Sequence, residues 1–396
     1  MLFLISLFAV FAATSAQKTL SVNTTEGVVV GYGEEYFEFY GLRYGGPVSG
    51  ANRFKAPTPA TPYPSEFHAQ DKNIRCLQRT STGHVGVEDC LYLNVFTKNA
   101  TFAKPVFVWL EGEGYLSSGM NPSFKQLISQ DVVIVSLNYR VSIFGFLCLG
   151  VPEAPGNAGL KDIILGLNWI KNNIAAFGGD PNNVILLGHG SGAAMVDLIT
   201  MSPLAQGLVH KAIVLSGSAL APWAVAYDPI GYANIVGSKL AYNGKKPTEL
   251  AKALISTDIE VLMPVLDYEF TNNSVLFAPC IENPKLNGSF ITEAPINILR
   301  TGNYSQIPYL IGYTDREGSL RAAEAETWTK SMFVNFTQFL GVDLAFDTEA
   351  IKKNASSSIF NFYFANGTYI EIEDYLDYHG DTSILVPAIR SALERA

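Results

Sequence analysis

A strand-to-helix turn at residues 188–192 constrains the fold of this chain more than any other feature. The run Val184-Ile185-Leu186-Leu187 before it is short and apolar, as in a buried strand, and residues 193–199 after it have helical character. The turn itself reads Gly188-His189-Gly190-Ser191-Gly192. This is the frame of a nucleophile elbow, Gly-x-Ser-x-Gly, whose central serine attacks an ester carbonyl. Here the central residue is Gly190, so the frame lacks the reactive hydroxyl.

Ser191 is the alternative centre of the turn. The tight turn requires small residues two positions before and two positions after its centre. Centring on Ser191 would place His189 in one of these positions, whereas centring on Gly190 places Gly188 and Gly192 there. The nucleophile of such an elbow sits in a backbone conformation that costs about 1–3 kcal/mol, and glycine adopts it with little penalty. We therefore expect Gly190 at the nucleophile position.

Length and composition predict one soluble α/β domain. A chain of 396 residues can bury a large core, and 48% hydrophobic with 12% aromatic residues excludes a disordered protein. The net charge of −9 and the pI near 5.1 argue against binding to nucleic acids or anionic membranes. Beyond the N-terminus there is no apolar run of about 20 residues, so we expect no membrane anchor.

The N-terminus predicts secretion. Residues 2–11 are apolar but too few to span a bilayer, and Ala13-Thr14-Ser15-Ala16 offers a small-residue cleavage site. We therefore expect a signal peptide at 1–16, a single domain at 17–396 and an extracellular location. Eight Asn-x-Ser/Thr sequons predict a heavily glycosylated surface. They start at Asn23, Asn99, Asn272, Asn287, Asn303, Asn335, Asn354 and Asn366.

Four cysteines in an oxidising compartment raise the question of pairing. Cys76 and Cys90 are close enough in sequence to close a short loop, whereas the sequence leaves the pairing of Cys148 and Cys280 open. No group of His and Cys residues has the spacing of metal ligands. We therefore expect no metal and no other cofactor.

Several longer motifs indicate a family. The chain resembles the type-B carboxylesterase/cholinesterase family, most closely its insect branch, over residues 20–396. The resemblance rests on Glu88-Asp89-Cys90-Leu91-Tyr92-Leu93-Asn94, Asn138-Tyr139-Arg140-Val141-Ser142-Ile143-Phe144-Gly145-Phe146, Ala154-Pro155-Gly156-Asn157-Ala158-Gly159-Leu160-Lys161-Asp162, the segment Asn173 to Pro181, and Ser216-Gly217-Ser218-Ala219.

The resemblance implies an α/β-hydrolase fold, with a central, mostly parallel sheet flanked by helices. Short apolar runs at 106–110, 132–137, 184–187, 212–215 and 309–312 alternate with helical segments such as 163–175, in agreement with this fold. The family also implies a Cys76–Cys90 disulfide and buried ion pairs between Arg53 and Glu88 and between Arg140 and Asp162.

Two further parts of the catalytic machinery can be placed by the resemblance. It implies Glu317 as the triad acid and the backbone N–H groups of Glu113, Gly114 and Ser191 as the oxyanion-hole donors. Glu113 stands where the family has glycine. An inward-turned Glu113 carboxylate ~4 Å from the developing charge would cost about 4 kcal/mol at an effective dielectric of about 20. In the alternative interpretation, Glu111 and Glu113 face solvent and this repulsion does not arise.

No histidine of the chain fits the role of the catalytic base. The family's histidine lies beyond the segment that this chain spans, and His379 in His379-Gly380-Asp381 is expected to be an exposed loop residue. His189 is expected to pack near the elbow without a role. His68, His84 and His210 precede Glu317 and have no triad counterpart. The fold is therefore expected to lack its last strand or strands, in a truncated gene model or an isoform, and to leave a sheet edge unpaired.

The leading hypothesis is a secreted, catalytically inactive glycoprotein of the esterase type that acts by binding an extracellular protein partner. One alternative is an active carboxylic ester hydrolase that uses Ser191 and a histidine outside this chain. The other is sequestration of a small apolar or cationic ligand above an anionic floor of Glu111, Glu113 and Glu317.

Overall fold

The structure is a computed structural model that describes residues 18–101, 103–118, 122–242, 244, 246–267, 269–364 and 369–396. The expected signal peptide at 1–16 and the sequon asparagine Asn366 lie outside the described residues. Within the described residues, ten strands form one sheet in the order β1-β2-β3-β7-β9-β8-β10-β11-β12, with β4 paired to β2, and β5 and β6 form a separate hairpin.

The strands follow the apolar runs of the sequence. Their bounds are β1 Lys18–Thr24, β2 Gly27–Gly33, β3 Phe37–Arg43, β4 Phe67–His68, β5 Gln78–Thr80, β6 Gly83–Val85, β7 Tyr92–Thr97, β8 Lys104–Leu110, β9 Val133–Leu137, β10 Gly179–His189, β11 Lys211–Leu215 and β12 Tyr309–Gly312. Strands β9, β8, β10, β11 and β12 are parallel, whereas β1, β2, β3 and β7 pair antiparallel with their neighbours on the path. The sheet is thus mixed, because its first strands are joined by direct turns and its later ones by helical crossovers.

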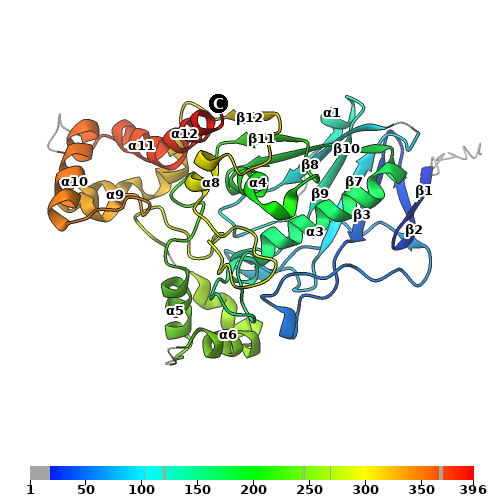
Figure 1. Ribbon diagram of the computed structural model, residues 1–396, viewed down its shortest axis with the longest axis horizontal. Coiled ribbons are helices and arrows are strands. Elements are labelled where there is room, and N and C mark those ends of the chain that lie inside the picture. Colours follow the sequence, from blue (N-terminus) through cyan, green and yellow to red (C-terminus); the bar gives the residue numbers. More distant parts are fainter. Residues whose placement is uncertain are drawn as a thin grey trace, which may run out of the picture.

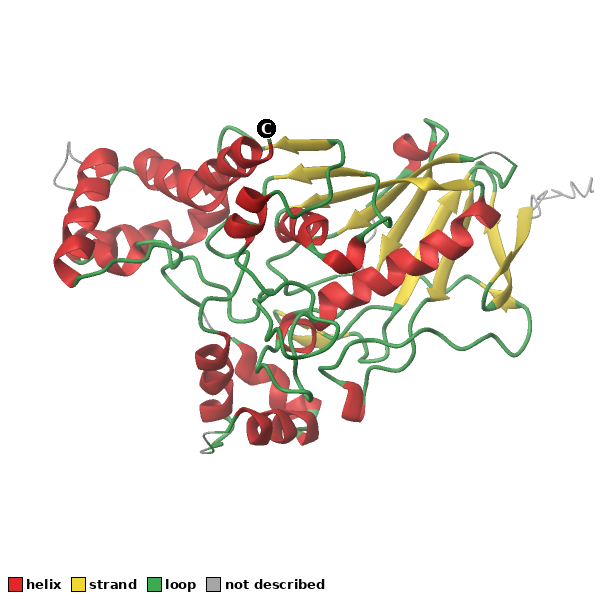
Figure 2. Cartoon of the chain, in the orientation of Figure 1, coloured by secondary structure: helices red, strands yellow, loops and turns green. Residues whose placement is uncertain are grey.

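Most of the longer helices fall into three groups (Figures 1 and 2). Helices α3 and α4 run beside the parallel strands, α5 and α6 lie below them in the view, and α9 to α12 form a lobe at the left. Their bounds are α1 Lys125–Ile128, α2 Ser142–Phe146, α3 Ala158–Asn173, α4 Ser191–Met201, α5 Pro229–Lys239, α6 Pro247–Ser256, α7 Ile259–Leu262, α8 Pro295–Thr301, α9 Ala325–Val334, α10 Glu349–Phe364, α11 Ile372–Gly380 and α12 Val386–Arg395. Among the described helices, none combines the length and the apolar character needed to cross a membrane.

Shorter helical turns join these elements. The 3-10 turns are η1 Gly50–Asn52, η2 Ile174–Phe177, η3 Pro203–Ala205, η4 Met263–Leu266, η5 Glu317–Glu324 and η6 Phe336–Phe339, and a π-helical turn, η7 Asp381–Leu385, joins α11 to α12. We call residues 317–395, from η5 to α12, the helical lobe. A hydrophobic cluster that includes Trp328, Phe336, Phe339 and Tyr378 fills its interior, apart from the main core.

The apolar residues of helix α3 explain why this helix packs beside the sheet. Leu160, Ile163, Leu167 and Ile170 recur at helical spacing and are all buried in the main core. Each such side chain contributes about 1.5–3 kcal/mol when fully buried. The expected helix at 163–175 is therefore present, but it begins at Ala158 and its α-helical part ends at Asn173.

Strand β12 is the last strand of the sheet order, and in the described residues it pairs only with β11. An open groove of about 410 Å³ runs over the sheet surface beside it, lined by residues such as Phe107, Ile213 and Leu310. Leu310 on β12 is 57% exposed. This edge agrees with the expectation of an unpaired strand and of exposed apolar surface.

Candidate functional site

The turn at the end of β10 is a sharp one, centred on Gly190. Gly190 has φ +58° and ψ −124°, a conformation that L side chains rarely adopt. A Cβ at Gly188 would lie 2.3 Å from the Gly192 carbonyl oxygen, and one at Gly192 would lie 2.3 Å from the Leu110 carbonyl oxygen. A Cβ at Gly190 itself would meet only the Gly112 carbonyl oxygen, at 3.3 Å. The flanking positions thus require glycine sterically, whereas a side chain at the centre would make one tight contact and adopt a strained backbone conformation.

Ser191 lies inside the protein at the start of α4. Its side chain is buried, with 4% of the residue exposed, and its Oγ accepts a hydrogen bond of 3.1 Å from the Tyr115 N–H. The hydroxyl is therefore held against the loop after β8. In the described part of the chain no histidine forms a hydrogen bond with it.

The loop after β8 contains Glu113 and Gly114, two of the positions predicted for the oxyanion hole. Gly112 packs against the elbow so closely that a Cβ there would lie 2.0 Å from the Gly192 nitrogen. Gly114 has φ +59°, and a Cβ there would meet no atom within 4 Å. Glu113 is exposed and Glu111 is half-buried. The structure thus agrees with the alternative in which Glu113 faces solvent, which removes the close repulsion considered above.

Glu317 opens η5, directly after the loop that follows β12. Its Oε1 accepts hydrogen bonds from the Ser216 hydroxyl at 2.8 Å and from the Thr314 N–H at 2.6 Å. Glu317 is half-buried, so these two donors keep a carboxylate satisfied without a histidine. No role for Ser216 was predicted from the sequence, although Ser216 lies in the motif Ser216-Gly217-Ser218-Ala219, on which the resemblance partly rests.

His379 is not an exposed loop residue, and that expectation is wrong. It lies in α11, is 0% exposed, and packs its ring against Trp328, Tyr375 and Tyr378. Neither ring nitrogen has a hydrogen-bond partner among the described residues. Burial, and to a lesser extent the nearby positive charge of Arg321, lower the pKa of His379 to about 3. The residue therefore acts as a neutral core side chain.

In the described part of the chain, the remaining histidines form no hydrogen bond with Glu317. His189 is exposed rather than packed at the elbow, because the strand turns its side chain to solvent there. His68 contacts Tyr32, His84 pairs with Glu260, and the Nδ1 atom of His210 accepts a hydrogen bond from the Val184 N–H. Among the described residues, no group of His, Cys, Asp and Glu is arranged to hold a metal ion.

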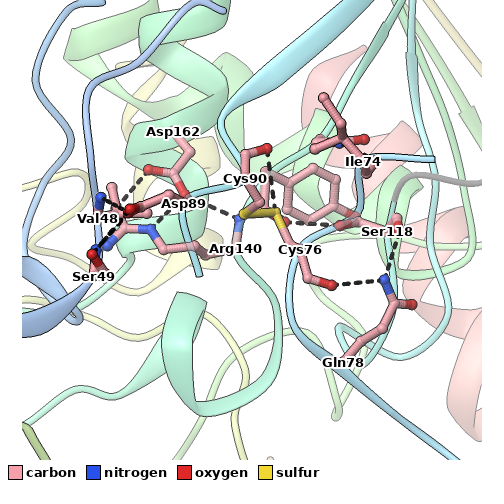
Figure 3. Close-up of a disulfide and its surroundings, with 12 residues drawn as sticks. Val48, Ser49, Ile74, Cys76, Gln78, Asp89, Cys90, Ser118, Arg140 and Asp162 are labelled. Carbon is pink, nitrogen blue, oxygen red and sulfur yellow. Dashed lines mark hydrogen bonds and ion pairs between the residues drawn. A yellow bond between two sulfur atoms is a disulfide. The ribbon is translucent and has the colours of Figure 1, made fainter. Parts of the chain in front are cut away.

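The disulfide and the ion pairs implied by the resemblance are present, and Figure 3 shows the disulfide and the Arg140–Asp162 pair. Cys76 and Cys90 are bonded. The Arg140 guanidinium forms two hydrogen bonds with Asp162, at 2.6 and 2.8 Å, where both side chains are almost completely buried. Arg53 and Glu88 form a second pair, at 2.7 Å.

Three long-range links were not predicted. Cys148 and Cys280 form a disulfide across 132 positions, and closing a loop of that length stabilises a fold by about 5 kcal/mol in the chain-entropy model. Lys161 and Glu282 form a buried ion pair at 2.9 Å beside it. Helix α4 of the elbow is tied to α12 by an ion pair of 2.6 Å between Asp197 and Arg395.

None of the cavities described is lined by the elbow. The largest, an open cavity of about 900 Å³, is lined by residues that include His84, Glu88 and Glu260. One of about 400 Å³ is lined by residues at the end of α4, including Thr200, and by the segment around Tyr304. One of about 310 Å³ is lined by residues 219–229 and parts of α8 and α12. Neither Gly190 nor Glu317 lines them.

Comparisons with known proteins agree with this architecture. The model of the "Carboxylesterase family" matches residues 18–396. The bile salt-activated lipase of Rattus norvegicus is 35% identical over 337 residues, which are 78% of this chain and 54% of the lipase. Venom carboxylesterase-6 of Apis mellifera is 32% identical over 322 residues, 76% of this chain and 58% of that protein. The chain thus spans little more than half the length of these relatives.

Among solved structures, juvenile hormone esterase from Manduca sexta is similar in fold. Its TM-score is 0.86, at 24% sequence identity, and the alignment covers 96% of this chain and 76% of the esterase. The ligand OTFP is covalently attached to that esterase. At this level of identity the likeness supports the fold alone.

Proposed function

Because the chain belongs to the carboxylesterase family, we propose that it is a secreted family glycoprotein that does not hydrolyse esters and acts by binding. The observation that carries the proposal is Gly190. Ester hydrolysis in a site of this type begins with attack by the elbow side chain, and glycine has no atom that could attack. The neighbouring residues of the turn keep its geometry.

The surroundings of Gly190 support this proposal. Ser191, the alternative nucleophile, is buried, and its Oγ accepts a hydrogen bond from the Tyr115 N–H. Activation of a serine requires a base within hydrogen-bond reach, and the described histidines are engaged elsewhere or exposed. Glu317 keeps two donors that stabilise its charge without any imidazole.

Secretion and glycosylation are part of the proposal. The apolar N-terminus, the two disulfides and the sequons support it. Of the sequon asparagines, Asn23, Asn287, Asn303, Asn335 and Asn354 are exposed, whereas Asn99 and Asn272 are half-buried. An extracellular protein is the partner we favour, and a small apolar or cationic ligand is the alternative.

Hydrolysis of a short-chain p-nitrophenyl ester by the secreted protein tests the proposal. Wild type and Ser191→Ala are compared with a heat-denatured sample of each. We expect no turnover above the denatured samples for either protein. Turnover by wild type that disappears in Ser191→Ala would establish Ser191 as a nucleophile and overturn the proposal.

A further inference from the structure

A second site is indicated by the cavity of about 310 Å³ between the loop after β11, the start of α8 and α12. Its volume lies at the lower end of the range found for small-molecule pockets. Its lining comprises Ala219, Leu220, Val225, Ala226, Tyr227, Pro229, Ile281, Ala294, Pro295, Ile296, Asp343 and Arg390. None of these residues belongs to the elbow, to the loop after β8 or to the surroundings of Glu317.

Most of this lining is apolar. Ala219, Val225 and Pro295 are buried, and Leu220 and Ile296 are half-buried beside them. Such a surface favours the apolar part of a ligand, because binding removes hydrocarbon from water. An apolar pocket with a few converging polar groups is the usual form of a small-molecule site.

The polar groups of the cavity come from three separate segments. Tyr227 follows β11, Asp343 follows η6, and Arg390 lies on α12. Burial raises the pKa of Asp343, and the Arg390 guanidinium opposes that rise. Burial, and then the Asp343 charge, raise the pKa of Tyr227 to about 12. The three groups therefore line the same open cavity, with Asp343 half-buried and with Tyr227 and Arg390 exposed at its surface.

Asp343 and Arg390 form no direct ion pair in the part of the chain that the structure describes, although they interact electrostatically. Each charge thus keeps the capacity to bind an opposite charge. A guanidinium offers two parallel N–H groups that fit a carboxylate, and an aspartate accepts hydrogen bonds from an ammonium group. A ligand with only one charge would be repelled either by Asp343 or by Arg390, whichever has the same sign.

We propose that this cavity binds a small zwitterion of the α-amino-acid class with an apolar side chain. Its carboxylate would contact Arg390, its ammonium group Asp343, and its side chain the apolar wall at Val225 and Pro295. The proposal does not depend on the absence of esterase activity, because the cavity shares no residue with the elbow.

Isothermal titration calorimetry on the full secreted chain tests both charges of the ligand. The probes are L-phenylalanine and L-leucine, with N-acetyl-L-phenylalanine and L-phenylalaninamide as forms that lack one charge. We expect at least one free amino acid to bind, and each capped form to bind at least about tenfold more weakly. Absence of binding by both free amino acids at about 1 mM, or equal binding by a capped form, would overturn the proposal.

Three variants test the location. Arg390→Gln and Asp343→Asn should each weaken amino-acid binding at least about tenfold. Arg300→Gln is the matched control, because Arg300 pairs with Glu394 of α12 but does not line the cavity. Thermal unfolding of each variant verifies the fold. Folded Arg390→Gln and Asp343→Asn proteins that bind like wild type would place the site elsewhere and contradict the proposal.

Discussion

The elbow and the helical lobe differ in how they hold the side chains that could take part in catalysis. At the elbow, the Oγ of Ser191 accepts a hydrogen bond from the Tyr115 N–H. In the described part of the lobe, the hydroxyls of Tyr375 and Tyr378 are hydrogen-bonded, but both ring nitrogens of His379 are buried without a partner. The proposed loss of activity thus combines an elbow without a reactive side chain at its centre with a lobe whose histidine is enclosed by aromatic rings.

The contacts at the elbow show that close packing and catalysis are separate reasons for keeping the same residues. Gly188, Gly192 and Gly112 are needed for close packing of strand, loop and helix, whether or not a reaction takes place there. Similarly, Gly380 packs against Gly318, next to Glu317, while the imidazole of His379 lies among aromatic rings. Packing can therefore keep the frame of a site, whether or not the site has a function.

The largest expected effect comes from breaking the link between the two regions. Asp197 of α4 is fully buried and accepts hydrogen bonds from Arg395, Ser218 and the Ala219 N–H. Removing Arg395 leaves this carboxylate buried and without its counter-charge, so Arg395→Ala should lower the free energy of unfolding by about 3–5 kcal/mol. Urea unfolding followed by circular dichroism measures it.

An exposed pair on the same helix provides the control. Glu394 of α12 pairs with Arg300 at 3.1 Å near the surface, so Glu394→Ala should cost at most about 1 kcal/mol. Equal losses for Arg395→Ala and Glu394→Ala would mean that the buried pair does not join the elbow to the lobe in the way described.

Alanine substitutions at two neighbouring elbow glycines should lower the free energy of unfolding by different amounts. Gly192→Ala brings a Cβ within 2.3 Å of a backbone oxygen and should cost about 3 kcal/mol or more. Gly190→Ala makes one tight contact, at 3.3 Å, and adds the backbone strain of its positive φ, so it should cost less, about 1–3 kcal/mol. Thermal unfolding ranks the two. A larger loss for Gly190→Ala would show that the turn is not centred on residue 190.

The lobe should weaken in acid because of His379. Its pKa is about 3 in the folded state and 6.5 for an ordinary histidine, so between these values the unfolded state binds a proton that the folded state does not. Stability should therefore fall as the pH drops below about 6.5, by about 1.4 kcal/mol per pH unit and by about 2 kcal/mol at pH 5.

His379→Phe should remove this part of the acid dependence, and His68→Phe, at an exposed position, should leave it in place. Urea unfolding at pH 7 and pH 5 provides the comparison. If His379→Phe and wild type lose the same free energy between these two pH values, His379 does not remain neutral in the folded lobe.

The sequence predicted the features that are local or that belong to the family's motifs. The elbow, the parallel strands and α3 follow from short-range patterns of apolar residues and glycines, and the Cys76–Cys90 and Arg140–Asp162 contacts were implied by the resemblance. The burial of His379 was missed because part of its environment comes from Trp328 on α9, about 50 positions earlier in the chain. The Cys148–Cys280 and Asp197–Arg395 contacts join positions too far apart for local patterns to indicate.

Labelling with a fluorophosphonate probe tests most directly the proposal that the elbow has no nucleophile. The secreted wild-type protein, Ser191→Ala and Gly190→Ser are treated with the probe in the folded state and after denaturation. We expect no labelling of wild type or of Ser191→Ala above the denatured samples, and Gly190→Ser shows whether a restored hydroxyl alone is sufficient. Labelling of folded wild type that is lost in Ser191→Ala would show that Ser191 is a nucleophile and would overturn the proposal.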